Sequence, residues 1–400
     1  MDSEPDNLSP FPKELKTILM AVTVVFAFNV WEHSPAVVPN HYTDLVSIYY
    51  RNGIGNGPLG IPYVDYVFEY PALVGIVVYV AALIARSSTP DFLASLIEYK
   101  LIIDIVIYAF TLITVIFLYR LTARYRVDPK RIWQAFLVMP SLLMFVDYNF
   151  DIIAIAFTVL ALYMFIRGSH TMSAISLGLG VCAKLYPAVL LPAFLAALPS
   201  WRSRGRYAVA AAALVVAVNL PFMLMNFQTW FGTWSFLAGW GIENSWLIFI
   251  FGQMDPMAHY FGLAVLLYVM YKVMAETHHR EISSDEKLLT RCFLLSLGWL
   301  LSSYIVTPQM ALILLPFYVL IPTVPILAAY ASDTLNALIM VFWFAEMGAG
   351  RNPIAPDNPI QWMALARQII WLGLLVQGLY PSKLGRWVKG LLGPLTSQPR

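Results

Sequence analysis

Long apolar runs recur along the whole 400-residue chain, and they constrain its fold more than any other feature. Each run has about 15 to 22 residues, the length that a helix needs to cross the hydrocarbon core of a bilayer. Hydrophobic residues make up 60% of the chain and Asp, Glu, Lys and Arg only 12%, whereas soluble domains carry roughly 25% charged residues. The sequence therefore predicts an all-α, polytopic membrane protein and excludes a set of water-soluble domains.

Prolines and polar residues divide these runs into candidate membrane segments. The segment 172–199 is too long for one ordinary span, and Lys184 and Pro187 would interrupt a helix in its middle. We therefore expect two short antiparallel helices there, and about twelve crossings in all. The candidate segments are 17–34, 101–119, 132–147, 151–167, 172–199, 207–226, 257–275, 289–305, 308–322, 324–345 and 360–380.

The basic residues indicate how these segments are oriented. Most of the 25 Lys and Arg residues fall in the tails and in short loops near 120–131, 167–171, 200–206 and 276–291. Because positive charge marks the cytoplasmic side, we expect both termini to be cytoplasmic. A full crossing by residues 71–85 would turn the loop 120–131 outward, so we expect 71–85 to lie in the outer interface or to enter only partway.

One membrane-embedded domain is expected over residues 1–400, with cytoplasmic tails at 1–16 and 381–400. The first tail is acidic, so it lacks the basic segment of a removable signal peptide. On the outer side this topology leaves two long loops, 35–100 and 227–256. Their aromatic and apolar composition suits interfacial helices, so any chemistry is expected on that extracytoplasmic face.

Charge and cysteine content exclude several functions. The net charge is only +2 and the basic residues are dispersed over loops, so nucleic acid is not an expected partner. Cys182 and Cys292 both lie inside apolar segments, which argues against a disulfide framework. His33 and His41 share the first outer loop, but their spacing and the lack of a third ligand predict no metal site.

A carboxylate follows the first span in the first outer loop. The run 41–51 predicts a short helix with Asp44 in its first turn and Arg51 at its end. Asp is common at helix starts, where it caps the backbone or interacts with the helix dipole, so a structural role for Asp44 is the alternative to a functional one. Further along the same loop, Asp65 and Glu69 form a second acidic group.

Ionisable residues also lie inside or beside apolar segments, where charge is expensive and indicates a site. Asp147 and Asp151 are four residues apart and would share one face if a helix continued through them, and Asp151 could instead cap its helix. Lys184 lies between two apolar half-helices with no acidic residue nearby in sequence. We expect it to face an anion, either a ligand phosphate or a protein carboxylate.

The order of these features resembles that of the integral-membrane glycosyltransferases of the C type (GT-C). The similarity is to polyprenyl-phosphate-mannose-dependent mannosyltransferases, related to those that make phosphatidylinositol mannosides and GPI anchors. It covers residues 15–200. The features that carry it are Asp44 after the first span, Phe68-Glu69-Tyr70-Pro71, Asn149-Phe150-Asp151, Ala183-Lys184-Leu185-Tyr186-Pro187 and, less specifically, Gly241-Ile242-Glu243-Asn244-Ser245-Trp246 and Thr307-Pro308-Gln309.

This resemblance implies transfer of a sugar from a polyprenyl-phosphate donor to a lipid or glycan acceptor. Asp44 would be the catalytic base, Asp151 would orient donor or acceptor, and Lys184 would contact the donor phosphate. The paired-Asp pattern of GPI-type relatives is incomplete, because Val46 stands two residues after Asp44. The other residues expected to line the donor and acceptor site are Arg51, Asp65, Glu69, Tyr186, Glu243 and Gln309.

The residues suit that chemistry without a metal or a cofactor. A sugar phosphate already contains a leaving group, so the acceptor needs one base and the phosphate needs a cation. Two other classes stay open. A secondary transporter also uses broken helices with charged residues, although no inverted repeat is evident and the carboxylates collect on one face. A non-catalytic subunit that binds polyprenyl lipid would leave Asp44 dispensable.

Overall fold

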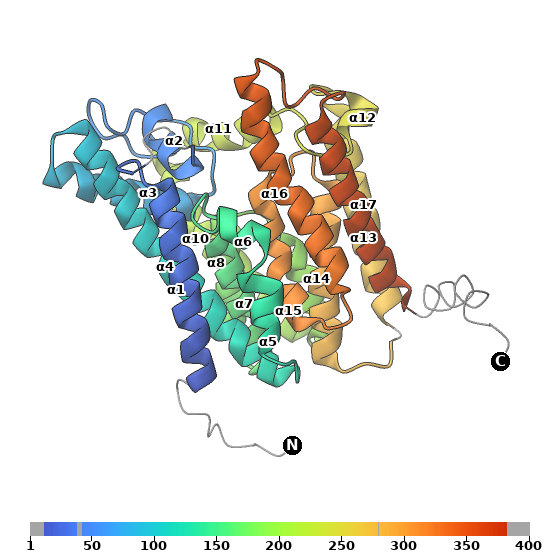
Figure 1. The fold of residues 1–400 in the computed structure, drawn as a ribbon. Helices are drawn as coiled ribbons and strands as arrows, with labels where there is room; N and C mark the ends of the chain where they lie inside the picture. The colour runs from blue at the N-terminus through green and yellow to red at the C-terminus, as the bar shows by residue number, and fades with distance from the viewer. Residues whose placement is uncertain (1–11, 38–41, 279, 382–400) are drawn as a thin grey trace. The chain divides into compact units, whose positions relative to one another are not determined.

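The computed structural model describes residues 12–37, 42–278 and 280–381, and every regular element in these ranges is helical (Figure 1). The described residues form no strand, and only two isolated bridges join Pro62 to Tyr66 and Glu243 to Ile305. The all-α fold predicted from the apolar runs is confirmed. Most of the predicted tails, 1–16 and 381–400, and also His41, lie outside the described residues.

The chain forms two compact units. The first comprises residues 1–188, 205–239 and 311–322, and the second comprises residues 189–204, 240–310 and 323–400. The helices of the first unit are α1 (Lys13–His33), α2 (Asp44–Arg51), α3 (Ala72–Ser88), α4 (Phe92–Arg124), α5 (Lys130–Ile132), α6 (Pro140–Phe145), α7 (Asp151–Ile166), α8 (His170–Ala183), most of α10 (Trp201–Met225), α11 (Phe227–Ala238) and α15 (Leu315–Leu320). Those of the second are α9 (Leu191–Ala197), α12 (Ile248–Phe251), α13 (Met257–His278), α14 (Ser284–Ser302), α16 (Ile326–Gly348) and α17 (Pro359–Leu379).

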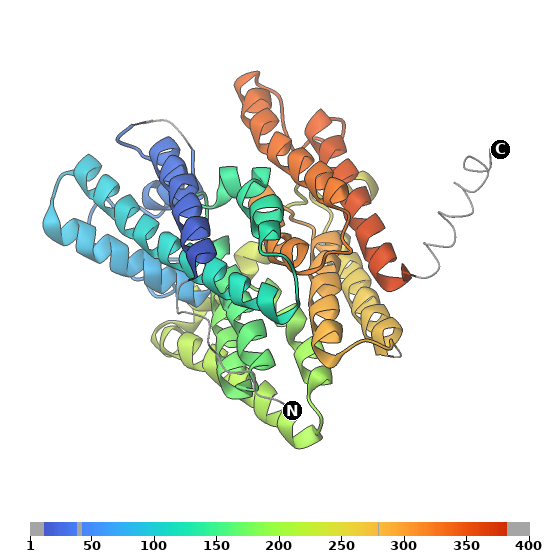
Figure 2. The same cartoon turned by 60° about the horizontal axis from the view of Figure 1, so that its bottom comes forward.

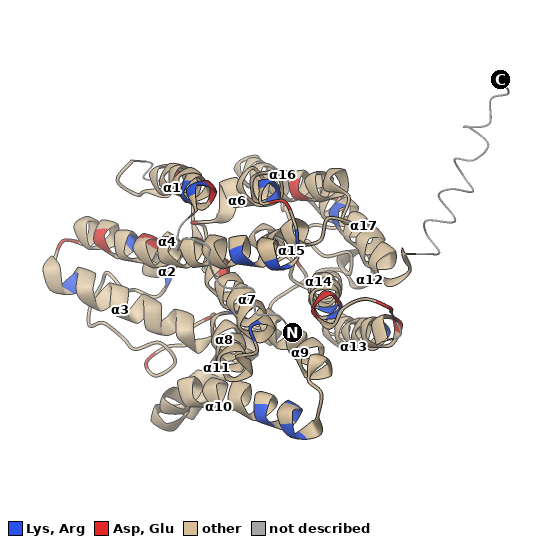
Figure 3. Cartoon of the chain, turned by 90° about the horizontal axis from the view of Figure 1, so that it is seen from below, with Lys and Arg blue, Asp and Glu red and all other residues tan. Residues whose placement is uncertain are grey.

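Among the described helices, six are long and apolar enough to cross a membrane: α1, α4, α10, α13, α16 and α17. Shorter apolar helices accompany them, including α3, α7 and α8. Most of the ribbon carries no charge, and many of the charged residues lie near helix ends and in loops (Figure 3). These helices confirm a polytopic membrane protein, while the count of twelve crossings and their direction stay predictions.

Helix α4 organises part of the first unit, because both α1 and α3 pack against it (Figure 2). It begins at Phe92, where the Asp91 side chain accepts a hydrogen bond from the Ala94 N–H at 2.8 Å. The helix is longer than the predicted span 101–119, which it contains, and it includes the last residues of the predicted outer loop 35–100. Lys100 and Asp104 pair one turn apart inside the helix, so these charges do not interrupt it. Which part of α4 crosses the membrane stays a prediction.

The predicted single helix over 132–147 is wrong. After α5 the chain forms a π-helical turn, η1 (Trp133–Leu137), then leaves helical geometry at Met139 and restarts at Pro140. Proline favours the first turn of a helix, since its nitrogen has no hydrogen to donate and its φ is already helical. The segment is therefore two short helices joined by a bend.

The predicted break near Lys184 is confirmed. Helix α8 ends at Ala183, Lys184 adopts an extended backbone, and a 3₁₀ helix, η2 (Tyr186–Leu190), follows. In a continuous helix, Pro187 would have no N–H to donate to the Ala183 carbonyl and its ring would clash with that carbonyl, which explains the interruption. The antiparallel arrangement of the two halves stays a prediction.

Residues 72–88 form a complete helix, α3, which packs against α4 and α8. The loop before it is tied down by Tyr63, whose hydroxyl donates to the Tyr70 carbonyl at 2.7 Å. The Tyr63 ring lies so close to Gly75 that a Cβ there would stand 2.3 Å from it. A side chain at Gly75 would therefore displace the loop that carries Glu69 and Tyr70.

Candidate active site

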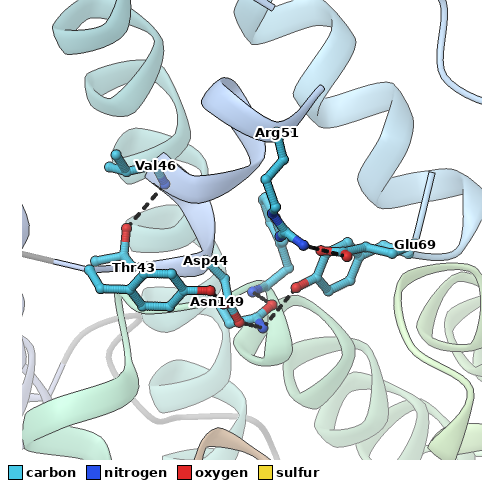
Figure 4. A network of polar contacts seen from close by, with 9 residues as sticks. Thr43, Asp44, Val46, Arg51, Glu69 and Asn149 are labelled. Carbon is cyan, nitrogen blue, oxygen red and sulfur yellow. Dashed lines mark hydrogen bonds and ion pairs between the residues drawn. The ribbon is translucent and has the colours of Figure 1, made fainter. Parts of the chain in front are cut away.

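Asp44 is the centre of a polar network at the start of α2. The N-cap of this helix is Thr43, whose hydroxyl oxygen accepts a hydrogen bond from the Val46 N–H at 3.1 Å (Figure 4). Asp44 is therefore not the cap, and its carboxylate has other partners. The Tyr42 hydroxyl donates to Oδ1 at 2.9 Å, and the Asn149 amide donates to Oδ2 at 2.6 Å.

The electrostatic setting of Asp44 suits proton transfer. Burial raises the pKa of this carboxyl to about 6, and the negative charge of Glu69 adds to the rise, while the Tyr42 hydrogen bond and the positive charges of Lys184 and Arg51 oppose it. Burial also raises the pKa of Tyr42, so its phenol stays protonated and donates. A carboxylate with a pKa near 6 is mostly ionised at neutral pH yet accepts a proton more readily than an exposed one.

Asn149 and Tyr70 are part of this network, although neither was a predicted site residue. Asn149 lies in the turn between α6 and α7, and its amide also donates to the Tyr70 hydroxyl at 3.1 Å. The side-chain oxygen of Asn149, Oδ1, accepts a hydrogen bond from the Phe150 N–H at 2.5 Å, which fixes the orientation of the side-chain amide. Both residues stand in the two short motifs that carry the sequence resemblance, and that position was the available signal.

Lys184 has a carboxylate partner, one of the two anions expected for it. Its ammonium lies 3.3 Å from Asp151 Oδ2 and 4.9 Å from the centre of the Tyr70 ring. The Lys184 side chain is 20% exposed, whereas that of Asp151 is 2% exposed. Asp151 is the first residue of α7, where the helix dipole favours negative charge.

Asp147 and Asp151 would share one face only in a helix that continues through both, and the structure does not contain such a helix. Helix α6 ends at Phe145 and α7 begins at Asp151, so the chain turns between the two carboxylates. Asp147 pairs with Lys100 of α4 at 2.6 Å, and Asp151 pairs with Lys184. The two aspartates therefore belong to different ion pairs at the two ends of one short turn.

The remaining predicted residues of the first unit have different surroundings. Arg51 and Glu69 form a two-fold ion pair, with nitrogen to oxygen distances of 2.8 and 2.7 Å, beside the Asp44 network (Figure 4). Tyr186 is buried and shares a hydrogen bond of 3.0 Å with Thr158. Asp65 is exposed and accepts from the Ile61 N–H at 2.6 Å, so it closes its own loop.

Two predicted residues, Glu243 and Gln309, belong to the second unit. Glu243 accepts hydrogen bonds from the Trp240 indole at 3.3 Å and the Asn244 amide at 3.4 Å, and Gln309 is buried in η3 (Pro308–Leu314). Arg367, a fully buried residue of α17 in the same unit, was not among the predicted site residues. Its guanidinium donates to Asn336 Oδ1 and to the carbonyls of Asn244 and Val306 at 2.5, 2.9 and 3.1 Å.

Within the ranges that the structure describes, no group of three or more His, Cys, Asp or Glu residues is placed to hold a metal ion. Both cysteines are buried and unpaired. The chemistry available from the described side chains of the first unit is therefore that of carboxylates, a lysine, tyrosines and amides. Such groups transfer protons and bind anions or hydroxyls.

The apolar helices define a polytopic membrane protein. Its first unit holds a polar site, which contains the half-buried Asp44 and the ammonium of Lys184 beside Asp151. A family model described as glycosyltransferase family 87 matches residues 68–303, more than half of the chain, and the chain belongs to this family. It is a GT-C-like family of membrane glycosyltransferases, so this protein is a membrane glycosyltransferase. The comparison with curated proteins gave no match. The matched range includes Glu69, Asn149, Asp151 and Lys184, and it begins after Asp44.

Proposed function

We propose that this glycosyltransferase moves a sugar from a polyprenyl-phosphate carrier to a hydroxyl of a lipid or glycan acceptor, and that the sugar is mannose. Asp44 is the general base. The observation that carries the proposal is the placement of this carboxylate between the donors Tyr42 and Asn149, with its pKa raised by burial to about 6. A base at this value is ionised at neutral pH and still accepts a proton from an attacking hydroxyl.

The proposed step is a single displacement. The acceptor oxygen attacks the anomeric carbon of the donor sugar while Asp44 takes the hydroxyl proton. The bond between the anomeric carbon and the phosphate oxygen breaks, and its electron pair leaves with the polyprenyl phosphate. One attack from the opposite side inverts the anomeric configuration, and it requires one carboxylate as base, with no second carboxylate as nucleophile.

Lys184 is the proposed contact for the departing phosphate. Its distance of 3.3 Å from Asp151 and its 20% exposure support an ammonium that can share a second anion. Asp151 then holds the lysine in place when no donor is bound. Arg51 and Glu69, as an ion pair beside Asp44, are proposed to shape the same site.

We further propose that the site faces the extracytoplasmic side and that both termini are cytoplasmic. The concentration of Lys and Arg in the tails and in alternate loops supports this orientation. Membership of a glycosyltransferase family argues against the transporter and the non-catalytic alternatives. Glucose, arabinose or another lipid-linked sugar would use the same polar groups, so the sugar is decided by experiment.

The test is sugar transfer in membranes from labelled polyprenyl-phosphate-mannose, with the unchanged protein compared with Asp44→Asn. Loss of the base lowers transfer by about 10²- to 10⁴-fold, while the protein still accumulates. The matched control is Asp91→Asn, because asparagine caps α4 as well as aspartate does. Equal transfer in Asp44→Asn and the unchanged protein would overturn the base, and transfer only from other labelled polyprenyl-phosphate sugars would overturn mannose.

A further inference from the structure

A second cluster of charges lies in the first unit, away from solvent. Lys100 of α4 pairs with Asp104, one turn along the same helix, and with Asp147, in the turn between α6 and α7. The Lys100 and Asp147 side chains are 2% and 0% exposed. The mechanism proposed above uses none of these three residues.

Such a cluster requires a reason, because charges sealed from water lose their hydration. Two carboxyl groups share one ammonium here, and the same two carboxyl groups also share a side-chain hydrogen bond. Substituting apolar side chains for a buried ion pair is often neutral or stabilising, so stability alone is a weak explanation. A specific geometry is the better-attested use of buried charge.

The turn that Asp147 anchors leads directly to the Asp44 network. Two residues after Asp147, Asn149 donates to Asp44, and two residues further on, Asp151 pairs with Lys184. Outside the helices, this turn has few backbone hydrogen bonds, among them the one from the Tyr148 N–H to the Phe145 carbonyl at 3.3 Å. Side-chain contacts therefore carry much of its placement.

We propose that Lys100 is a positioning residue, which ties the turn 147–151 to α4 through Asp147 and so holds Asn149 against Asp44. Asp104 is the other partner of Lys100 and shares a side-chain hydrogen bond with Asp147, so it supports the same connection from within α4. The placement of the turn is independent of the reaction, while its consequence for the transfer rate rests on the proposed role of Asp44.

The decisive comparison is Asp147→Leu with Asp104→Leu. Each change removes one carboxyl group of similar burial from the two that share Lys100, so each variant has one carboxylate with one ammonium. Asp147→Leu removes the side chain that ties the turn to α4, whereas Asp104→Leu leaves Asp147 paired with Lys100. Asp147→Asn retains an oxygen that accepts from Lys100, and it is expected to fall between Asp147→Leu and the unchanged protein.

Placement is measured without any donor, by labelling Asn149→Cys with a membrane-impermeant maleimide. Asn149 is 2% exposed, and Cys182 and Cys292 are buried, so background labelling is low. Adding Asp147→Leu is expected to speed labelling at least about tenfold because the turn opens locally. Adding Asp104→Leu leaves the rate unchanged. Equal rates in the two double variants would overturn the proposal.

Transfer measures the consequence of the same changes. Asp147→Leu is expected to lower kcat by about tenfold to a hundredfold, because misplacement by about 1 Å has that effect on a reacting group. It also moves the acidic limb of the pH profile upward, since a hydrogen bond to the ionised Asp44 is lost. Asp104→Leu changes neither. Full transfer by Asp44→Asn would overturn the proposed base without affecting the positioning role, because the labelling rates test that role separately.

Discussion

Two lysine and aspartate pairs stand at the two ends of the turn 147–151, and they are built in opposite ways. Lys100 and Asp147 are 2.6 Å apart, with side chains 2% and 0% exposed. Lys184 and Asp151 are 3.3 Å apart, and the lysine is 20% exposed. The first pair is sealed and the second is open, although the same two residue types form both.

The difference follows from what else supports each carboxylate. Asp151 begins α7 and is favoured by the helix dipole, so it does not depend on Lys184 alone. Asp147 lies before the start of α7, and its carboxylate forms an ion pair with Lys100 of α4. The same two residue types thus form a buried pair at one end of the turn and a partly exposed pair at the other, which agrees with the proposed roles of Lys100 in positioning and of Lys184 in anion binding.

The largest expected effect is on stability, from Lys100→Met. This change leaves two buried carboxyl groups without a cation and is expected to destabilise the protein by about 3–5 kcal/mol. The folded fraction that survives heating in detergent, followed by size exclusion, measures it. Lys184→Met is the matched change, and a loss as large for Lys184→Met would break the distinction between sealed and open pairs.

The next effect is on transfer, from Lys184→Met. Loss of a bond to a charged group is worth roughly 1.5–3 kcal/mol, so kcat/KM is expected to fall by about tenfold to a hundredfold. Initial rates at several concentrations of labelled polyprenyl-phosphate-mannose measure it. Lys272→Met, in the Lys272–Glu276 pair of α13, is the control expected to transfer normally. An unchanged kcat/KM for Lys184→Met would exclude it from the donor site.

The pH profile sharpens the comparison further. Asp44 acts as a base only when it is deprotonated, so transfer is expected to rise with pH through an acidic limb near pH 6, the value to which burial raises the pKa of this carboxyl. The Lys184 charge lowers this pKa, so Lys184→Met moves the limb to higher pH. Asp104→Leu leaves it in place. An acidic limb at the same pH in Lys184→Met and the unchanged protein would show that the Lys184 charge does not lower the pKa of Asp44.

The smallest expected effect is on stability, from the most exposed of the ion pairs compared, Arg51 with Glu69. The Arg51 side chain, paired with Glu69, is 43% exposed, and surface pairs contribute between about 0 and 1 kcal/mol. Arg51→Gln should therefore reduce stability by no more than about 1 kcal/mol in the same heating experiment. A loss comparable to that of Lys100→Met would show that exposure does not rank these pairs.

Local signals predicted several features correctly. The run 41–51 predicted a helix with Asp44 in its first turn, and the described part is α2 (Asp44–Arg51). Lys184 and Pro187 predicted the end of a helix, and α8 ends at Ala183. Both rest on capping and proline chemistry, which act over a few neighbouring residues and can be read from the chain directly.

Other features depended on partners far away in sequence, and there the sequence misled. Lys100 and Asp104 lie within α4, and Asp147, 47 residues away from Lys100, completes their ion pairs, a partner that the sequence did not indicate. Asn149 was not a predicted site residue, because its contact with Asp44 joins residues 105 positions apart. Such contacts have no local signature.

Apolar runs of membrane length were enough to predict the all-α membrane fold, because a helix satisfies its own backbone hydrogen bonds in lipid. The order of residues also indicated which ionisable side chains stand beside those runs. How these side chains pair became known only from the folded chain, in which Asp147 is buried against Lys100 and Asp151 contacts a partly exposed Lys184. The physical reason is that burial and charge pairing depend on distances between helices, and residue order along one chain does not specify those distances.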